Sequence, residues 1–534
     1  MSAITQNDAF VAAIEIGSSK ITGMIGRRMS DGSTQVLAMA QENSSSFIHK
    51  GAVYNVDKTV LCLKDIKTRL QNAVGRRIAC VYVCFGGQGM HSVRNTVSRQ
   101  FEVETRISQE LVDSIYEENR TQCLPEYYLL DIIPQEYKLG SQFSMSPVGV
   151  LSSGIEGRFL NIVIRRTFYN NIKSCLEQAG IEVVQFYTTP IVLANAVLNV
   201  DSDKRPGCAL VDIGRDTTTV AVYQKNLLRH LSVIPLGSDN VTKDIASSLS
   251  IEESEAESLK LKYGSAYTEL MEETEDENYT LKDGRLVSRK LLCDIVEARM
   301  EEILVNVSDQ ITASGIKDTL IAGAVLTGGG ANIKDIDKAF TVYTGIEKLK
   351  VAKNVNFAVN SKIADVKVKD GTRNAILGLL ALGDENCAGT DIKEEDSSLF
   401  VDEELETKKT TETVSTRTKV EELNGQPKPV IKEDTETHQA EKTEEEIKAE
   451  KEKKKQSGRK TQEQEGPSID KSSKNTLRTI IFKEGAVIRQ TSIGGARCCV
   501  DGMEVRPYLD GSGCERGSFL SGFVCLHNSV YIIF

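Results

Sequence analysis

The sequence has no tryptophan, and aromatic residues make up only 6% of its 534 residues. A binding platform built from stacked aromatic side chains is therefore not expected. A net positive charge is also missing, since 76 acidic residues outnumber 65 basic ones. The formal net charge of −11 argues against a nucleic-acid-binding protein, because phosphate backbones require a basic surface.

Long apolar runs are missing as well. No stretch approaches the roughly 18–20 residues that a membrane-spanning helix needs. The N-terminal residues lack a basic region followed by an apolar core, so we expect no signal peptide. The twelve cysteines show no Cys-x-x-Cys spacing, which indicates reduced, structural thiols in a cytoplasmic protein.

What is present falls into three zones. Residues 8–384 alternate apolar strands with amphipathic helices and predict a globular core. Residues 385–475 are charged, rich in threonine and nearly free of aromatics, so they cannot bury enough apolar surface and predict a disordered linker. Residues 476–534 become apolar again and end in "SFLSGFVCLHNSVYIIF".

The periodicity of the core predicts a mixed order of strands and helices. Residues 10–27 predict a β-hairpin that 34–43 extends, and short strands are predicted at 80–87 and 323–330. Helices are predicted at 55–74 (with Val60, Leu61, Leu63, Ile66 and Leu70 near one face), 107–120, 170–180, 240–249, 251–263, 289–310 and 372–382.

Two polar turns carry the strongest chemical signal. Each joins two apolar strands through an acid, a glycine and hydroxyl residues: "EIGSSK" at 15–20 and "DIGRDTT" at 212–218. Backbone N–H groups of such a turn can hold an anion, and a carboxylate beside phosphates is favourable when it holds Mg²⁺ or its water. One such turn is more often an ordinary β-turn, but the pair indicates a duplicated α/β protein that binds a nucleotide.

A third turn supports this interpretation. "LTGGGAN" at 326–332 ends a strand with three glycines before a predicted helix. A simple strand-to-helix turn needs one glycine, whereas three indicate close approach of a ligand to the backbone.

These three turns, in this order, resemble the actin/DnaK/sugar-kinase superfamily and, within it, the bacterial cell-division FtsA family. The resemblance covers about residues 8–384. It includes "VYVCFGGQGMHSVRNTVSRQFEVE" (81–104), "PVGVLSSGIEGRFLNIVI" (147–164) and "IPLGSDNVTKDIASSLSIEESEAESLKLKYGSA" (234–266). Residues 81–165 resemble the extra subdomain that is particular to FtsA.

The resemblance implies an α/β, actin-like ATPase fold of two duplicated domains with an FtsA-type extra subdomain, followed by the linker and the short apolar tail. The expected division is a first domain (8–80 and 166–205), the extra subdomain (81–165), a second domain (206–370, including a helical subdomain at 240–320), a closing helix (371–384), the linker (385–475) and a tail as candidate membrane or partner contact (476–534).

The resemblance also implies an ATP and Mg²⁺ site. The first phosphate hairpin would be Gly17, Ser18, Ser19 and Lys20, and the second Asp212, Gly214, Thr217 and Thr218. Asp212 would be the catalytic residue and would hold Mg²⁺ through a water. The nucleoside would lie against Glu257, Lys260, Gly328, Gly329 and Gly330. Without the family, Glu257 and Lys260 would be interpreted as a solvated ion pair one helical turn apart.

Three departures from the family pattern concern catalysis. Glu15 replaces the usual aspartate, Arg215 and Asp216 replace glycines, and Thr189 stands where relatives place a Gln or Glu that orients water. The Arg215 guanidinium either obstructs the phosphate cradle or adds a positive charge to it. We predict that ATP binds and that its hydrolysis is weak or absent.

The function implied is that of an actin-like cell-division protein. It would polymerise, bind the C-terminal peptide of the tubulin homologue FtsZ, tether the division ring to the inner face of the cytoplasmic membrane and recruit later division proteins. It would be cytoplasmic, peripheral on the membrane and without nucleic-acid partners. The alternatives are a pilus-assembly relative of FtsA acting as a scaffold and a small-molecule kinase or phosphatase.

The C-terminal tail departs from the basic amphipathic helix by which the family binds membranes, since it carries no charged side chain after Arg516. Three interpretations stay open. Residues 517–534 insert shallowly into the membrane, residues 476–534 form a small β module, or the reading frame is disturbed after the linker.

Overall fold

A computed structural model describes residues 10–122, 125–268 and 278–391, and the backbone of six short strands between residues 479 and 533. The chain divides into two units, Met1–Arg417 and Thr418–Phe534. The predicted linker, apart from its first seven residues, lies outside the described residues.

The first sheet has the strand order β12-β7-β1-β2-β3-β20. Strands β1, β2 and β3 are antiparallel neighbours. The other pairings are parallel: β7 pairs with β1, β12 with β7, and β20 with β3. The strands are β1 (Phe10–Ile16), β2 (Lys20–Arg28), β3 (Thr34–Asn43), β7 (Val81–Phe85), β12 (Val183–Thr188) and β20 (Val359–Ser361).

Helices cover both faces of this sheet. On one face the side chains of α1 (Val56–Val74) occupy the space above Gly23, where an added Cβ would lie 2.6 Å from Ile66. On the other face Leu380 of α9 (Asn374–Leu382) packs equally closely over Gly26. Helix α3 (Arg166–Gln178) packs against α1 on the first face, and helix α4 (Thr189–Val197) packs against α9 on the other.

The second sheet repeats the same topology. Its order β15-β14-β13-β18-β19 matches β3-β2-β1-β7-β12, with three antiparallel strands and two parallel ones. The strands are β13 (Cys208–Ile213), β14 (Thr218–Gln224), β15 (Leu227–Ile234), β18 (Gly323–Thr327) and β19 (Leu349–Val351). The duplication predicted from the two polar turns is therefore present in the strand order.

Helices pack around this second sheet. Helix α7 (Arg289–Ala313) contacts β14 and β15 through buried residues spaced three or four apart, as a helix with one apolar face requires. The others are α5 (Ser238–Leu249), α6 (Glu253–Tyr263) and α8 (Ile336–Thr344), with a small hairpin of β16 (Asn278–Thr280) and β17 (Leu286–Ser288).

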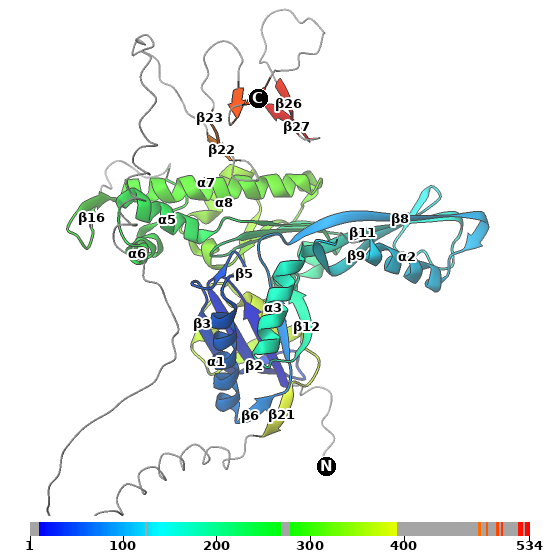
Figure 1. Cartoon of the computed structure of the whole chain (residues 1–534), viewed down its shortest axis with the longest axis horizontal. Coiled ribbons are helices and arrows are strands. Elements are labelled where there is room, and N and C mark those ends of the chain that lie inside the picture. The colour runs from blue at the N-terminus through cyan, green and yellow to red at the C-terminus, as the bar shows by residue number, and fades with distance from the viewer. Residues whose placement is uncertain are drawn as a thin grey trace, which may run out of the picture. The chain divides into compact units, whose positions relative to one another are not determined.

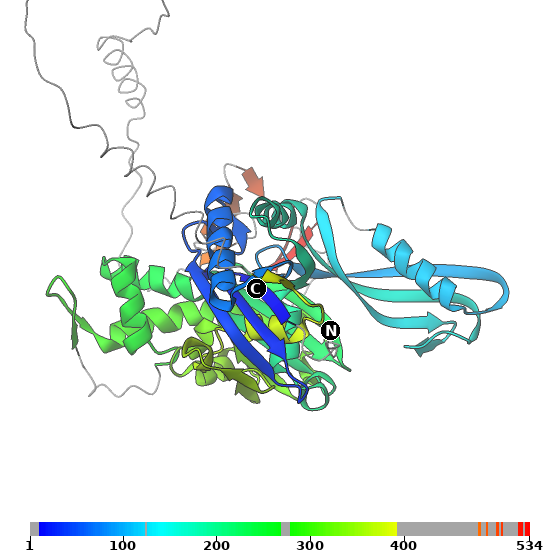
Figure 2. The same cartoon turned by 90° about the horizontal axis from the view of Figure 1, so that it is seen from below.

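An additional layer of strands extends the second sheet beyond β15. Strands β8 (His91–Arg106), β11 (Leu151–Arg165), β9 (Tyr127–Leu139) and β10 (Gln142–Ser144) follow in that order, and His91 pairs with Ser232 of β15. Together with α2 (Gln109–Thr121) they project sideways from the two sheets (Figure 1) and have an apolar core of their own. Figure 2 shows the same projection from below.

The strand pairing corrects two of the expected boundaries. Residues Val81–Phe85, assigned to the extra subdomain, form β7 in the middle of the first sheet, so the strands of the additional layer begin only at His91. Residues Val359–Ser361, assigned to the second domain, pair with β3 at the edge of the first sheet. Both corrections concern pairings between residues far apart in sequence.

The predicted helices occur, with ends shifted by at most four residues. Helix α1 begins after Asn55, whose side chain accepts a hydrogen bond from the Lys58 N–H, and ends at Gly75 with φ of 65°. Leu61, predicted on its apolar face, is instead 66% exposed, and Thr59 is buried in its stead.

The remaining short strands are β4 (Ile48–His49), β5 (Ala52–Val53), β6 (Arg76–Ile78) and β21 (Ala388–Asp391). Near the C-terminus three two-stranded hairpins pair β22 (Thr479–Ile481) with β23 (Val487–Arg489), β24 (Cys498–Val500) with β25 (Met503–Val505), and β26 (Gly522–Leu526) with β27 (Ser529–Ile533). Their side chains, and with them the expected membrane contact, lie outside the described residues. Among the described helices, none combines the length and apolar character required to cross a membrane.

Candidate functional site

A cleft of about 980 Å³ opens between the two sheets, and both polar turns line it. With one exception, every site residue predicted from the sequence lines this cleft. The lining residues among them are Gly17, Ser18, Ser19, Lys20, Asp212, Gly214, Thr217, Glu257, Lys260, Gly328, Gly329 and Gly330.

The exception is Thr218, which does not line the cleft. Its side chain is fully buried, and its hydroxyl donates to the Leu236 carbonyl at 2.9 Å. Side chains alternate along a strand, and Thr218 begins β14, so Thr217 and Thr219 face the cleft and Thr218 faces the opposite side. The expected phosphate contact by Thr218 is therefore replaced by a structural one.

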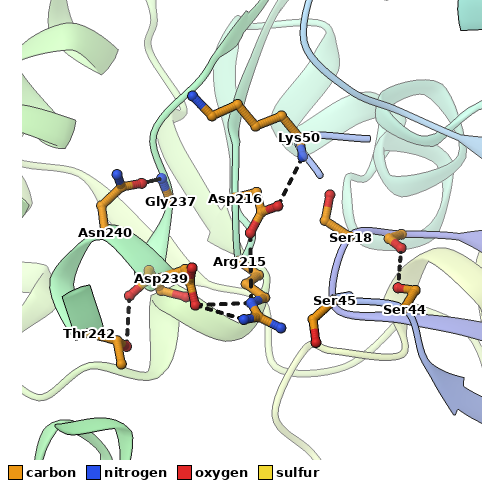
Figure 3. A network of polar contacts seen from close by, with 12 residues as sticks. Ser18, Ser44, Ser45, Lys50, Arg215, Asp216, Gly237, Asp239, Asn240 and Thr242 are labelled. Carbon is orange, nitrogen blue, oxygen red and sulfur yellow. Dashed lines mark hydrogen bonds and ion pairs between the residues drawn. The ribbon is translucent and has the colours of Figure 1, made fainter. Parts of the chain in front are cut away.

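The first turn, between β1 and β2, is closed by its own backbone. The Gly17 N–H donates to the Lys20 carbonyl at 3.2 Å. The Ser44 hydroxyl, labelled in Figure 3, donates to the Gly17 carbonyl at 2.6 Å. The Ser18 hydroxyl accepts a hydrogen bond from the Gly51 N–H at 2.8 Å. The turn is thus held from two sides before any ligand binds.

The second turn, between β13 and β14, is closed in the same way and rests on the first turn of α5. The Gly214 N–H donates to the Thr217 carbonyl at 2.9 Å, and the Asp239 N–H donates to the Arg215 carbonyl at 2.8 Å. A Cβ added at Gly237 would lie 2.3 Å from the Arg215 carbonyl oxygen, so only glycine permits this contact.

Arg215 is held by two carboxylates, Asp216 and Asp239, on the side of the cleft that the second sheet forms. Its Nε and Nη2 atoms each lie 3.0 Å from Asp239 Oδ1, and Nε lies 3.7 Å from Asp216 Oδ1 (Figure 3). Burial raises the pKa of Asp239, but Lys243 at 2.9 Å and Arg215 outweigh it and hold that pKa below its ordinary value. The guanidinium therefore already has a carboxylate partner and does not stand free in the cleft.

Asp216 reaches across the cleft. Its Oδ2 accepts a hydrogen bond from the Lys50 N–H at 2.9 Å, in the tight turn between β4 and β5 (Figure 3). Lys50 and Gly51 both have positive φ, and the Lys50 carbonyl accepts a hydrogen bond from the Gln88 N–H at 2.8 Å. This turn contacts both polar hairpins, since Gly51 holds Ser18 and Lys50 holds Asp216.

Two partly buried carboxylates lie at equivalent places in the two sheets, Glu15 in β1 and Asp212 in β13. Burial raises the pKa of Glu15 to about 7, with Lys20 opposing the shift and Asp212 adding to it. Burial likewise raises the pKa of Asp212 to about 6. The Glu15 Oε2 atom is buried with no hydrogen-bond partner, which leaves an oxygen free for a cation or a water.

The glycine turn after β18 closes on Asp212. Gly328 has φ of 87°, and a Cβ at this position would lie 2.3 Å from Asp212 Oδ1. Only glycine allows the backbone this near to the carboxylate.

Glu257 and Lys260 differ from the solvated pair that their spacing alone suggests. The Lys260 side chain is only 4% exposed, and its ammonium lies 2.7 Å from Glu257 and donates to the Ser238 carbonyl and the Thr242 hydroxyl. Glu257 is 42% exposed. Lys260 therefore fixes the position of Glu257, which is the more open of the two to the cleft.

Several cleft residues were not found by sequence reasoning. They include Asp239 and Thr242 of α5 and the turn at Asp370, Gly371 and Thr372. The "GSDN" start of α5 (237–240) and the "DG" at 370–371 are ordinary helix-start and turn signals, and they could have located α5 and the Asp370–Thr372 turn. Neither signal indicates that the turn lies in the cleft.

The hydrogen bond from Lys50 to Asp216 can be tested directly. We expect Asp216→Ala to raise amide hydrogen exchange at Lys50 about fivefold, since one lost hydrogen bond is worth ~1 kcal/mol. Asp216→Asn keeps an acceptor oxygen and should exchange almost like the wild type. Hydrogen exchange of the peptide containing Lys50 measures both, and equal rates in the two variants would contradict the contact.

The buried Glu15 predicts a pH dependence of stability in the ligand-free protein. The pKa of Glu15 is raised in the folded state. Its stabilising contribution to the unfolding free energy is therefore fully present below the ordinary pKa of 4.5 and is lost as the pH rises through about 7. Glu15→Gln cannot ionise, and we expect it to exceed the wild type in unfolding free energy at pH 8 by about 1–3 kcal/mol, and by less at pH 5.

Urea unfolding at the two pH values, with chelator and without nucleotide, measures this difference. The exposed Glu104→Gln is the matched control and should leave the pH dependence unchanged. Identical pH dependence of Glu15→Gln and wild type would show that Glu15 is not desolvated as described.

Comparison with known proteins agrees with this geometry. The family described as "Cell division protein FtsA" matches residues 209–371. The FtsA of Bacillus subtilis (strain 168) is 30% identical over 333 residues, covering 61% of this chain and 74% of that protein. The FtsA of Neisseria meningitidis serogroup B is 29% identical over 380 residues, covering 70% and 86%.

Among solved structures, a PilM-PilN type IV pilus biogenesis complex matches with a TM-score of 0.51 and 17% identity, covering 70% of this chain and 98% of that one. At this identity the likeness concerns the fold alone. The duplicated sheets and the sequence relatives agree, and the chain belongs to the cell division protein FtsA family, with its actin-like fold.

Proposed function

We propose that the cleft binds ATP with Mg²⁺ and that the chain is an actin-like cell-division protein that links FtsZ to the membrane. The observation that carries the nucleotide site is the convergence of both polar turns and the Gly328–Gly330 turn on one cleft. The phosphates would lie against Gly17, Ser18 and Gly214, whose turns are already closed by backbone hydrogen bonds.

The charge of the cleft supports the need for a divalent cation. Seven acidic residues line it (Glu15, Asp212, Asp216, Asp239, Glu253, Glu257 and Asp370) against five basic ones (Lys20, Arg215, Lys260, Lys262 and Lys334). A net-negative cleft repels a free nucleotide, and Mg²⁺ on the phosphates reduces this repulsion.

The described residues contain no cluster of three or more potential metal-ligating side chains. This fits Mg²⁺ held mainly by phosphate oxygens and waters, with Asp212 as the carboxylate that holds one of them. The unpartnered Glu15 oxygen offers a second acceptor nearby.

Weak or absent hydrolysis remains part of the proposal. Thr189 lines the cleft, so the residue at this place offers a hydroxyl to an attacking water. A hydroxyl is a weaker group for orienting a water than a carboxylate or an amide. Asp212 would then act chiefly through the metal.

The division role rests on family membership. We propose that the chain polymerises with ATP bound, that it binds the FtsZ C-terminal peptide, and that it recruits later division proteins while peripheral on the inner face of the cell membrane. The additional strands β8–β11 and α2 form a separate apolar core that projects from the two sheets, as a surface for further partners would.

Calorimetry with ATP and Mg²⁺ tests the nucleotide site on the full chain. We expect saturable binding by the wild type and at least about tenfold weaker binding by Asp212→Ala, which removes the metal-water acceptor. Thr218→Val is the matched control, because its hydroxyl faces the Leu236 carbonyl and not the cleft. Unchanged binding by Asp212→Ala, or equal loss in both variants, would refute the site.

The division role is tested by fluorescence anisotropy with a labelled FtsZ C-terminal peptide from the same bacterium. We expect a dissociation constant of about 1–100 µM, the range of a short peptide that docks on a preformed surface. A scrambled peptide of the same composition is the control. Indistinguishable binding of the two peptides would contradict the FtsZ assignment and leave the nucleotide site unaffected.

A further inference from the structure

A second cavity, of about 410 Å³, lies away from the cleft, where the additional strands meet the second sheet. Its walls come from β8, β9 and β11, from the β14–β15 hairpin and from the end of α7. None of the residues that line it belongs to the cleft.

The charge of this cavity is opposite in sign to that of the cleft. Four basic side chains line it (Arg94, Arg158, Lys225 and Arg229), and Glu136 is its single acidic lining residue. The lining of this cavity therefore has more basic than acidic side chains, whereas the whole chain has a net charge of −11. Low-dielectric walls focus the positive potential into the cavity.

Two of the arginines are fixed by neutral groups. Arg229 Nη1 donates to the Gln135 side-chain oxygen at 2.8 Å, and Arg94 Nη2 donates to the Ser314 carbonyl at 2.8 Å. Gln135 is itself buried and donates to the Leu228 carbonyl at 3.0 Å. The guanidiniums are therefore held in place without being neutralised.

Among the described residues, no carboxylate forms an ion pair with Arg94, Lys225 or Arg229. Arg158 is different, because Glu136 and Glu156 each bind it at 2.8 Å. Burial lowers the pKa of Arg229, and the charge of Arg94 lowers it further while Glu136 opposes the shift. Burial and Arg94 also lower the pKa of His230. The positive charges of Arg94 and Arg229 repel each other, and a bound anion would offset this repulsion and so stabilise the folded protein.

We propose that this cavity is an oxyanion-binding site, in which Arg94, Arg229 and Lys225 bind a ligand carrying more than one phosphate or carboxylate group. Guanidinium groups bind both kinds of oxyanion through paired N–H donors. The volume exceeds that of a single phosphate group and lies within the range of small-ligand sites.

Both kinds of oxyanion, phosphate and carboxylate, occur on molecules that could reach this cavity. Phosphate groups occur on free metabolites. Carboxylates occur in residues 394–406 of this chain, "EEDSSLFVDEELE", which contain seven acidic residues and no basic one, and which a second copy of the chain could offer. The experiment therefore uses one probe for each source.

The probes are inorganic pyrophosphate and a labelled peptide of residues 394–406, each titrated into the full chain by calorimetry and anisotropy. The double variant Arg94→Gln/Arg229→Gln keeps amide donors but removes both charges. We expect at least one probe to bind the wild type, to bind this variant at least about tenfold more weakly, and to weaken as salt is raised. The tighter probe identifies the source.

Arg27→Gln/Arg28→Gln is the matched control, since it removes two exposed arginines at the end of β2 that line neither cavity. Pyrophosphate that enters the cleft does so equally in all three proteins, so only the difference between variants counts. A 394–406 peptide with Gln and Asn in place of its acidic residues is a second control, which is tested on the wild-type protein alone. We expect this peptide not to bind. If neither probe distinguishes the Arg94/Arg229 variant from the control, the site is refuted.

Discussion

The cleft depends on two carboxylates that the fold partly buries at equivalent positions. Glu15 is the last residue but one of β1 and Asp212 the last but one of β13, and the same strand order around each brings them to the same cleft. Desolvation raises the pKa of both carboxyl groups, and the charge of Asp212 raises the pKa of Glu15 further, while Lys20 opposes this shift. Burying acid in this way destabilises the empty protein. The apolar cores of both sheets supply the stability that tolerates it, and a bound cation with its ligand would remove the penalty.

Arg215 and Asp216 fit into the second turn because each side chain has a polar partner nearby. Arg215 is bound by Asp239, and Asp216 accepts the Lys50 N–H from the facing lobe. The turn keeps its backbone closed by the hydrogen bond from the Gly214 N–H to the Thr217 carbonyl, and Asp216 links it to the Lys50 turn across the cleft. From sequence alone Arg215 had two opposite interpretations, obstruction or added positive charge. Neither described its actual state, because its partner lies 24 residues away on a helix whose start the sequence analysis placed two residues late.

The sequence predicted the elements well where one local signal dominates. The polar hairpins, the three-glycine turn and the helix of Val56–Val74 follow from turn chemistry, caps and periodicity. It failed where long-range pairing decides, since nothing near Val81–Phe85 or Val359–Ser361 shows that each joins the first sheet. Thr218 was misplaced because a family motif names residue types without the alternation of the strand that carries them. The burial of Lys260 depends on Ser238 and Thr242, which the helix spacing of Glu257 and Lys260 does not reveal.

The two cavities differ in sign, and strand β14 joins them. It begins at Thr218, directly after the turn in the acidic cleft, and ends at Gln224 in the wall of the basic cavity. Between these ends Val220 and Val222 are fully buried, and β14 is paired on both sides by β13 and β15. A strand held in this way cannot change register without moving its buried side chains to the other face. The register of β14 shifts against β15 between Val222 and Tyr223, just before the β14–β15 turn that carries Lys225. The cleft end of β14 is therefore fixed by its two neighbours, whereas the regular pairing is interrupted at the end that lines the basic cavity.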